Sequence, residues 1–275
     1  MFAFLSKFFQ KNKIEYASPV PLADCKIVRP YLLERSGIHD GTVIPFAVPY
    51  LSRAATDPMR NLSAYAVPRD YHLFFRELFD ELIPRLCEAF PQNRFVGFAD
   101  HSPIDEVDAA ARAGLGIIGK NHLLITPKYA SYVFLGEIVT DAHLPCRSQE
   151  IRTCEDCGAC MRICPANTCG VCLSALTQKK GELTEEEQVL IVSHGSVWGC
   201  DLCQSVCPHA KRAVADGTAF SPIPFFSELP IPHLTADALN AMSEEEFSQR
   251  AYAWRGRKTV QRNLHLTLKK GDDLC

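Results

Sequence analysis

The most informative stretch of this sequence reads Cys154-Glu-Asp-Cys157-Gly-Ala-Cys160-Met-Arg-Ile-Cys164-Pro165, and a later stretch reads Cys200-Asp-Leu-Cys203-Gln-Ser-Val-Cys207-Pro208. The first has the spacing C-x2-C-x2-C-x3-C-P of bacterial proteins with two 4Fe–4S clusters, in which the fourth cysteine ligates the other cluster. The second ends in the same Cys-Pro and supplies three more thiols. Residues 154–208, called the cassette below, are therefore predicted to hold two 4Fe–4S clusters.

The crosswise rule also divides the thiols between the clusters. One cluster receives Cys154, Cys157, Cys160 and Cys207, and the other receives Cys164, Cys200 and Cys203. Cys169 and Cys172 compete to be the eighth ligand. The remaining cysteines lie outside the spacing and are expected to be structural, as small hydrophobes: Cys25, Cys87, Cys146 and Cys275.

Other uses of so many cysteines fit less well. A zinc site is usually built from two spaced pairs, whereas the first stretch holds four cysteines at cluster spacing. A disulfide framework is typical of small secreted chains, whereas this chain has 275 residues and no apolar signal segment. We therefore expect reduced thiols and a cytoplasmic protein.

Composition restricts the partners. The chain is 47% hydrophobic, enough for a substantial core, and it has a net charge of −3. It lacks the global basic character of nucleic-acid-binding proteins, although a local basic surface remains open. No apolar run approaches the length of a bilayer span. We expect a monomer that does not associate with membranes.

Residues 1–146 are predicted to form an α/β domain. An amphipathic helix starts the chain, and a second helix over 28–35 has Pro30 early and Gly37 as its stop. Residues 42–50 are apolar and favour a buried strand, but their two prolines push it towards a sheet edge. Residues 69–90 have a helical apolar face, with a kink expected at Pro84.

The next segment centres on Asp100. Residues 94–100 form a predicted strand that delivers Asp100 to its carboxyl end, where ligands sit in open α/β sheets. A helix should follow, capped by Ser102 and ended by Gly114. Residues 117–126 and 131–140 are then predicted to pair as an antiparallel hairpin. The run Gly114-Leu-Gly-Ile-Ile-Gly119 matches a dinucleotide motif but precedes a strand, the reverse of the required order.

The rest of the chain is predicted to be helical. Residues 147–212 form a small two-cluster ferredoxin-like domain, and 213–275 form a helical extension that packs on the other two domains. Thr184 with Glu187 and Ser243 with Glu246 have capping-box spacing. The final helix, near 257–269, carries a basic set: Arg255, Arg257, Lys258, Arg262, Lys269 and Lys270.

Motifs outside the cassette resemble one family in their order. They are Tyr65-Ala-Val-Pro-Arg-Asp-Tyr71-His72, Asp100-His-Ser-Pro-Ile, Ala113-Gly-Leu-Gly-Ile-Ile-Gly-Lys120-Asn121 and Phe134-Leu-Gly-Glu-Ile-Val-Thr-Asp141. Together with the second cysteine stretch and, more loosely, Arg255–Leu264, they resemble the epoxyqueuosine reductases over roughly residues 41–265. Family members commonly carry a further C-terminal helical-repeat segment, so we expect a short form here.

The resemblance implies an activity. Members of the family are cytoplasmic, cobalamin-dependent enzymes with two 4Fe–4S clusters, and they reduce the epoxide of epoxyqueuosine in a tRNA anticodon to queuosine. It implies a tRNA substrate and a low-potential electron donor such as a ferredoxin or flavodoxin. The fold class expected is thus an α/β (α+β) cobalamin-binding domain followed by the ferredoxin-like domain.

The resemblance also implies residue roles. Asp100 matches the family's catalytic aspartate and would protonate the departing oxygen, although His101 departs from the family pattern. Cys172 matches the family segment that contains the eighth cluster ligand. A set of residues is implied at the corrinoid or substrate pocket: Tyr65, Arg69, Tyr71, Gly119, Lys120 and Asn121.

Three alternatives stay open at this stage. Asp100 can be a helix cap, and Tyr65, Arg69 and Tyr71 can be ordinary packing residues at a helix start. The enzyme can be a corrinoid-dependent reductase of another substrate, as in reductive dehalogenation. The protein can also be a non-enzymatic, two-cluster electron carrier with a docking domain.

Overall fold

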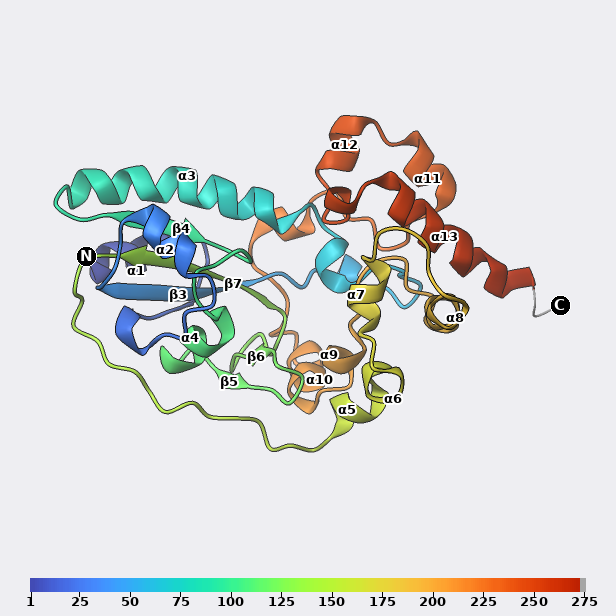
Figure 1. The fold of residues 1–275 in the computed structure, drawn as a ribbon, viewed down its shortest axis with the longest axis horizontal. Coiled ribbons are helices and arrows are strands. Elements are labelled where there is room, and N and C mark those ends of the chain that lie inside the picture. The colour runs from blue at the N-terminus through green and yellow to red at the C-terminus, as the bar shows by residue number, and fades with distance from the viewer. Residues whose placement is uncertain (273–275) are drawn as a thin grey trace. The chain divides into compact units, whose positions relative to one another are not determined.

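A computed structural model describes residues 1–272 of the protein, apart from the side chains of residues 168–169 and 269–272. Its contacts divide the chain into two compact units (Figure 1). The sheet unit comprises Met1–Tyr50, Phe74–Cys157 and His209–Ile223. The helical unit comprises Leu51–Leu73, Gly158–Pro208 and Pro224–Cys275. The sequence predicts three consecutive domains, whereas the two units alternate along the chain.

The sheet unit is built on a five-stranded sheet in the order β1-β3-β7-β4, with β2 also pairing with β3. The strands are β1 (Tyr16–Ala17), β2 (Val20–Pro21), β3 (Thr42–Pro49), β4 (Phe95–Phe98) and β7 (Val133–Thr140). Every pair in it is antiparallel. The predicted mixed α/β class is confirmed, but the rule that places ligands at the carboxyl ends of parallel strands does not apply to this sheet.

Strand β3 corrects the prediction of an edge strand. All eight of its residues are buried, and it pairs with β7 on one side and with β1 and β2 on the other. Pro45 is tolerated because it lies opposite the break between β1 and β2. Its carbonyl accepts from Ser18 N at 3.3 Å, and the N and O of one residue point to the same side of a strand. Proline has no N–H to donate, and at Pro45 that loss falls where β1 has ended and β2 has not yet begun.

The predicted hairpin of 117–126 with 131–140 is wrong. Short strands β5 (Ile117–Ile118) and β6 (Leu124–Ile125) instead pair with each other. The turn between them contains His122, whose φ of 62° breaks the extended run. Strand β7 lies between β3 and β4 in the main sheet, opposite β3 along its whole length. Long-range pairing therefore replaces the local hairpin.

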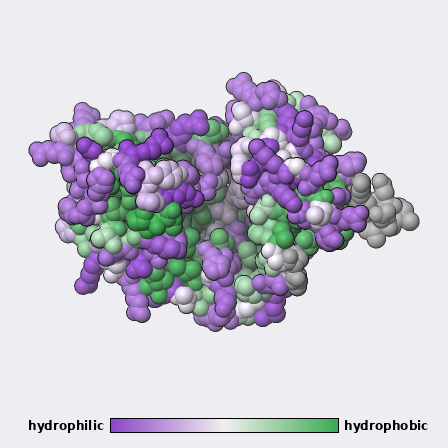
Figure 2. All heavy atoms as spheres, viewed as in Figure 1, coloured by the Kyte–Doolittle hydropathy of each residue, from purple (hydrophilic) through white to green (hydrophobic). Residues whose placement is uncertain are grey.

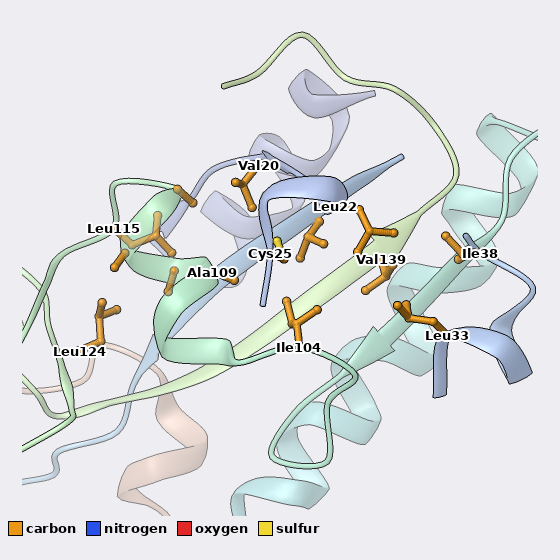
Figure 3. Packing of buried hydrophobic residues seen from close by; sticks show 14 residues of the cluster. Val20, Leu22, Cys25, Leu33, Ile38, Ile104, Ala109, Leu115, Leu124 and Val139 are labelled. Atoms are coloured by element: carbon orange, nitrogen blue, oxygen red, sulfur yellow. The ribbon is translucent and has the colours of Figure 1, made fainter. Parts of the chain in front are cut away.

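Helices cover both faces of this sheet. Helix α4 (Glu106–Arg112) contacts β3 and β7, and its alanines join an apolar cluster with Val139, Ile104 and Cys25 (Figure 3). The opposite face meets α1 (Phe2–Lys11) and α3 (Tyr71–Ala89). Gly136 permits that contact, because a Cβ there would lie 2.4 Å from the Phe75 ring. Helix α3 continues through Pro84.

Local helix signals were predicted with mixed success. Helix α2 (Pro30–Ser36) begins at Pro30 and ends at Gly37, whose φ is 66°. Both capping boxes are confirmed, at α8 (Glu185–His194) and α12 (Glu244–Ser248). Ser102, however, does not cap α4. The cap is Asp105, whose carboxylate accepts from Asp108 N. The Ser102 hydroxyl instead accepts from Ile104 N, before the helix begins.

The helical unit consists of short helices. They are η2 (Ala54–Thr56), η3 (Ala64–Ala66), α5 (Ala159–Ile163), α6 (Ala166–Cys169), α7 (Leu173–Thr177), α8, α9 (Leu202–Ser205), η4 (Pro224–Ser227), α11 (Ala236–Ala241), α12, η5 (Ala253–Arg255) and α13 (Arg257–Asp272). Two further elements lie wholly or largely in the sheet unit, η1 (Leu22–Asp24) and α10 (Pro208–Ala215). Within residues 1–272, no helix combines the length and apolarity needed to cross a membrane.

The cysteines outside the cassette differ from one another. Cys25 is buried in the apolar cluster below β7, as expected, whereas Cys87 is exposed on α3 and Cys146 is half-buried. Cys275 and the side chain of Cys169 lie outside the described part of the chain. Packing therefore supports a structural role for Cys25.

Candidate redox and acid sites

Asp100 lies two residues beyond the end of β4 and is exposed. Its φ of 65° is in the left-handed region, which side chains with a Cβ seldom adopt. Its backbone N donates to Glu106 Oε1 at 3.0 Å. The next residue, His101, contacts Tyr31 through Nε2 at 2.9 Å from Oη. The structure thus presents Asp100 on a short, tethered loop and does not use it as the cap of α4.

Two glutamates lie behind this loop and form the acid pair, Glu106 and Glu137. Glu137 projects from β7 on the face covered by α4 and is 1% exposed. Neither of its oxygens has a well-aligned hydrogen-bond partner among the described residues, although Ser102 and Glu106 are near enough to affect it. Burial, and then the charge of Glu106, raise the pKa of Glu137 well above its usual value. Burial likewise raises the pKa of Glu106 to about 7.

No role for this pair is predicted from the sequence. There, Glu106 is a residue of the first turn of a helix, and Glu137 is part of a family motif. A usable signal was present, because Leu135, Glu137 and Val139 alternate onto one strand face whose other members are apolar. A carboxyl at such a position is buried.

Cys154 and Cys157 belong to the sheet unit. The backbone N of Lys120 donates to Cys154 Sγ at 3.3 Å, and the Lys120 ammonium pairs with Asp156 at 2.9 Å. Gly119, Lys120 and Cys154 line a pocket of about 290 Å³. The structure places Gly119 and Lys120 beside a predicted cluster thiol, and Asn121 accepts from Leu123 N in the same turn.

The helical unit holds the other predicted ligands. The thiols of Cys160, Cys164, Cys200, Cys203 and Cys207 are half-buried and that of Cys172 is exposed, all without disulfides. No group of three or more metal-ligating side chains lies at coordination distance among the described residues. Cys172 and Cys203 nevertheless approach Cys200. Burial first, and then charges that include theirs, raise the pKa of the Cys200 thiol to about 12.

A thiol with a raised pKa, such as that of Cys200, can still become a metal ligand, because coordination to a metal deprotonates it. Soft thiolate donors in this number select iron–sulfur clusters or zinc. The donor set therefore fits the predicted clusters.

Asp201 connects the cassette to the Tyr65 segment within the helical unit. Its buried carboxylate accepts from Arg60 at 2.6 Å, from the Ser63 hydroxyl at 2.6 Å and from Ala64 N at 2.7 Å. Gly199 makes room for this approach, since a Cβ at its φ of +72° would lie 2.5 Å from Ser63. Tyr65 is thereby held next to Gly199 and the cysteine that follows it. Sequence reasoning missed Asp201, although a carboxylate between two cysteines was a visible signal.

Arg69 and Tyr71 lie in the same unit and already have partners. The Arg69 guanidinium lies 4.6 Å from the centre of the Phe225 ring and 3.6 Å from Glu228. Tyr71 meets Tyr65 edge-on at 6.5 Å. The structure therefore groups Tyr65 with Tyr71, and it gives Arg69 packing contacts of its own.

Two arginines of the basic helix α13 are engaged in hydrogen bonds within the protein, which its sequence does not indicate. Arg257 donates to the carbonyls of Leu239, Met242 and Ser243, and Arg262 donates to those of Lys179 and Gly181. Lys258 and His265 line a groove of about 610 Å³ with Glu182. Hydrophilic side chains dominate the face drawn over α11 and α13 (Figure 2). Lys269 and Lys270 lie outside the described side chains.

The thiol-rich helical unit and the antiparallel α/β unit with its buried acid pair suit an oxidoreductase that uses metal clusters. No family model matches the chain. A reductase of Bacillus anthracis is 32% identical over 95% of this chain and 72% of its own length, and one of Listeria monocytogenes is 34% identical over 74% and 55%. Both are epoxyqueuosine reductases. This chain belongs to the epoxyqueuosine reductase family.

Solved structures of epoxyqueuosine reductases have a similar fold. A crystal structure of epoxyqueuosine reductase with an epoxyqueuosine-modified tRNA-Tyr stem loop has a TM-score of 0.77 and 25% identity, covering 99% of this chain and 83% of that one. A Bacillus subtilis epoxyqueuosine reductase, with its catalytic aspartate loop swung out of the active site, has a TM-score of 0.75 at the same identity and coverage. The chain spans about half the length of the Listeria relative.

Proposed function

We propose that this protein reduces the epoxide of epoxyqueuosine in tRNA to the alkene of queuosine. The observation that carries the proposal is similarity to epoxyqueuosine reductases over 95% of the chain, joined by the fold it shares with a reductase bound to a modified tRNA stem loop. The reaction consumes two electrons and two protons, and the oxygen leaves as water. A source of electrons and a positioned acid are therefore both required.

Asp100 is the acid in this proposal. A carboxylic acid on an exposed loop can approach a bound nucleoside and give a proton to the departing oxygen. The tethered, left-handed loop of Asp100 supports this role, as does the mobile catalytic aspartate loop of the Bacillus subtilis reductase. The aromatic pair of Tyr65 with Tyr71 would contact a flat ligand. Arg69 stays a proposed pocket residue, although its guanidinium stacks on Phe225.

The thiols would hold two 4Fe–4S clusters, which supply electrons one at a time when bound. In the first cluster the donors would be Cys154, Cys157, Cys160 and Cys207. In the second they would be Cys164, Cys172, Cys200 and Cys203. Cys172 is proposed as the eighth ligand because its segment matches the family segment that contains that ligand. A low-potential ferredoxin or flavodoxin of the cytoplasm would reduce them.

A corrinoid is the cofactor that the family resemblance adds, and it would supply strongly reducing two-electron chemistry when bound. Tyr65 and Tyr71 remain its proposed neighbours. Gly119, Lys120 and Asn121 also remain proposed neighbours, and the hydrogen bond from Lys120 N to Cys154 Sγ would bring this turn next to a cluster ligand.

The decisive experiment is anaerobic reconstitution with iron and sulfide, followed by single-turnover assay on epoxyqueuosine tRNA with and without added cobalamin. Formation of queuosine is the expected result. Reconstituted protein that takes up electrons yet leaves epoxyqueuosine tRNA unchanged under both conditions would overturn the proposed substrate. Turnover without cobalamin would overturn the corrinoid proposal alone. Absence of any corrinoid binding, with clusters intact, would favour an electron carrier.

A further inference from the structure

We propose that Glu106 and Glu137 share one proton and that this acid pair positions the Asp100 loop. Its catalytic consequence rests on the proposed function, in which Asp100 is the acid. Glu106 and Glu137 are positioning residues, since they act through the loop and not on the substrate. Glu137 is buried without a well-aligned hydrogen-bond partner among the described residues, and the Glu106 carboxylate accepts a hydrogen bond from the loop.

Glu137 lies where an ionised carboxylate is costly. Its register partners are Pro45 on β3 and Phe98 on β4, so no charged side chain flanks it across the sheet. The apolar cluster of Figure 3 continues on the same face at Val139 and includes Ile104 and Ala109. A lone charge in such surroundings neutralises by binding a proton. Glu137 is therefore the protonated member of the pair.

Glu106 is the member that can be ionised. Its Oε1 accepts the backbone N–H of Asp100 at 3.0 Å, and Arg29, whose guanidinium donates to Ser102 O at 2.9 Å, favours its charged form. Protonated Glu137 can donate to Glu106, which favours the carboxylate further. The groups that face the pair from the surrounding elements are Arg29, Cys25, Asp100 and Ser102.

The tether matters because Asp100 has an unfavourable backbone conformation. The left-handed region is disfavoured for residues with a Cβ, although aspartate adopts it more often than most. A hydrogen bond to an ionised acceptor is stronger than one to a neutral acceptor. The Glu106 carboxylate therefore holds the loop firmly, and its protonated form holds it weakly. Since burial raises the pKa of Glu106 to about 7, the tether weakens as pH falls through neutrality.

The first test measures the tether without turnover. Hydrogen exchange of the Asp100 amide, corrected for its intrinsic pH dependence, should be protected about tenfold more at pH 8 than at pH 6. In Glu106→Gln that difference should vanish, because the neutral amide accepts equally at both pH values. Glu88→Gln, a substitution at an exposed glutamate of α3, should behave as wild type. Equal protection in wild type and Glu106→Gln would overturn the proposal.

The second test detects the shared proton. Infrared spectra of the holoenzyme at pH 8 should contain a protonated carboxyl band that Glu137→Gln removes and Glu88→Gln retains. A wild-type spectrum without that band would overturn the proposal. Both measurements are independent of substrate, so an inactive enzyme with the expected exchange and spectrum would count against the proposed reaction and not against the pair.

The third test is the pH profile of single-turnover rates. Glu137→Gln keeps a neutral donor to Glu106 and should preserve the acid limb near pH 7. Glu137→Leu removes the donor and should move that limb to higher pH by about one unit. A purely structural role would lower the rate in both variants without moving the limb, and that outcome would overturn the proposal.

Discussion

Strand β3 and helix α5 are held in place by different means. All eight residues of β3 are buried and its backbone is paired on both sides, whereas α5, which carries Cys160, has no buried residue. Apolar burial and a hydrogen-bond ladder define the strand. The helix has neither of these across its neighbours, and the proposed ligation of a cluster by Cys160 would supply the missing constraint. The chemistry of the cassette was therefore predicted from spacing alone, whereas the chemistry of the sheet unit depends on its packing.

The strongest test of that contrast removes one cassette thiol. Cys200→Ser should reduce the iron content of the reconstituted protein by roughly half and abolish turnover, because one of two four-iron clusters loses a ligand. Cys87→Ser, which changes an exposed thiol of α3, should leave both unchanged. The measurements are iron and sulfide per chain, with tRNA turnover. Full iron content in Cys200→Ser would remove Cys200 from the ligands.

The next largest effect is expected at Asp100. Asp100→Asn removes the proton but preserves size, so the single-turnover rate should fall by about 10²–10⁴-fold. Iron content and thermal midpoint should not change, because the side chain is exposed. Asp80→Asn on the outer side of α3 is the matched control. A rate within twofold of wild type would exclude Asp100 as the acid.

Paired core and cassette substitutions address stability directly. Phe46 is fully buried, with its ring centre 4.8 Å from that of Phe9, so Phe46→Ala should lower the free energy of unfolding by about 3–5 kcal/mol. Ile163 in α5 is 42% exposed, and Ile163→Ala should stay within about 0.5 kcal/mol. Denaturant unfolding of both variants gives the comparison. A large loss at Ile163 would show that burial also supports the cassette.

The smallest effects should come from helix caps. Thr184→Ala removes the side chain that accepts from Glu187 N at the start of α8, and Ser243→Ala does the same at α12. Each should cost about 1 kcal/mol of unfolding free energy, because one helix N–H loses its partner. Thr184→Ser and Ser243→Thr, which keep the hydroxyl, should recover most of it.

Features fixed by neighbouring residues were predictable. Pro30 and Gly37 bound α2, and two capping boxes start α8 and α12, because those hydrogen bonds join residues only a few positions apart. The pairing of β7 with β3 was not predictable in this way. It joins segments about ninety residues apart, and the apolar pattern of 131–140 suits a local hairpin as well as a central strand.

The same distinction between local and long-range contacts decides which residues of the candidate site were predictable. The cassette cysteines and Asp100 were predicted from the sequence, because motif spacing and a family motif identify them. The acid pair and the Asp201 anchor were not, since each depends on segments that meet only in the fold. The contact of Lys120 with Cys154 was not predicted either, because the two residues are 34 positions apart.

The alternation of the two units along the chain bears on biosynthesis. A domain with a continuous chain can fold as soon as it leaves the ribosome. Here the sheet unit lacks His209–Ile223 until the cassette has been translated, and the helical unit needs Leu51–Leu73 from early in the chain together with Pro224 onwards. The sheet unit is therefore completed only by the segment that follows the cassette, and the helical unit only by the segment after that. Both units remain incomplete while the cassette itself is being translated.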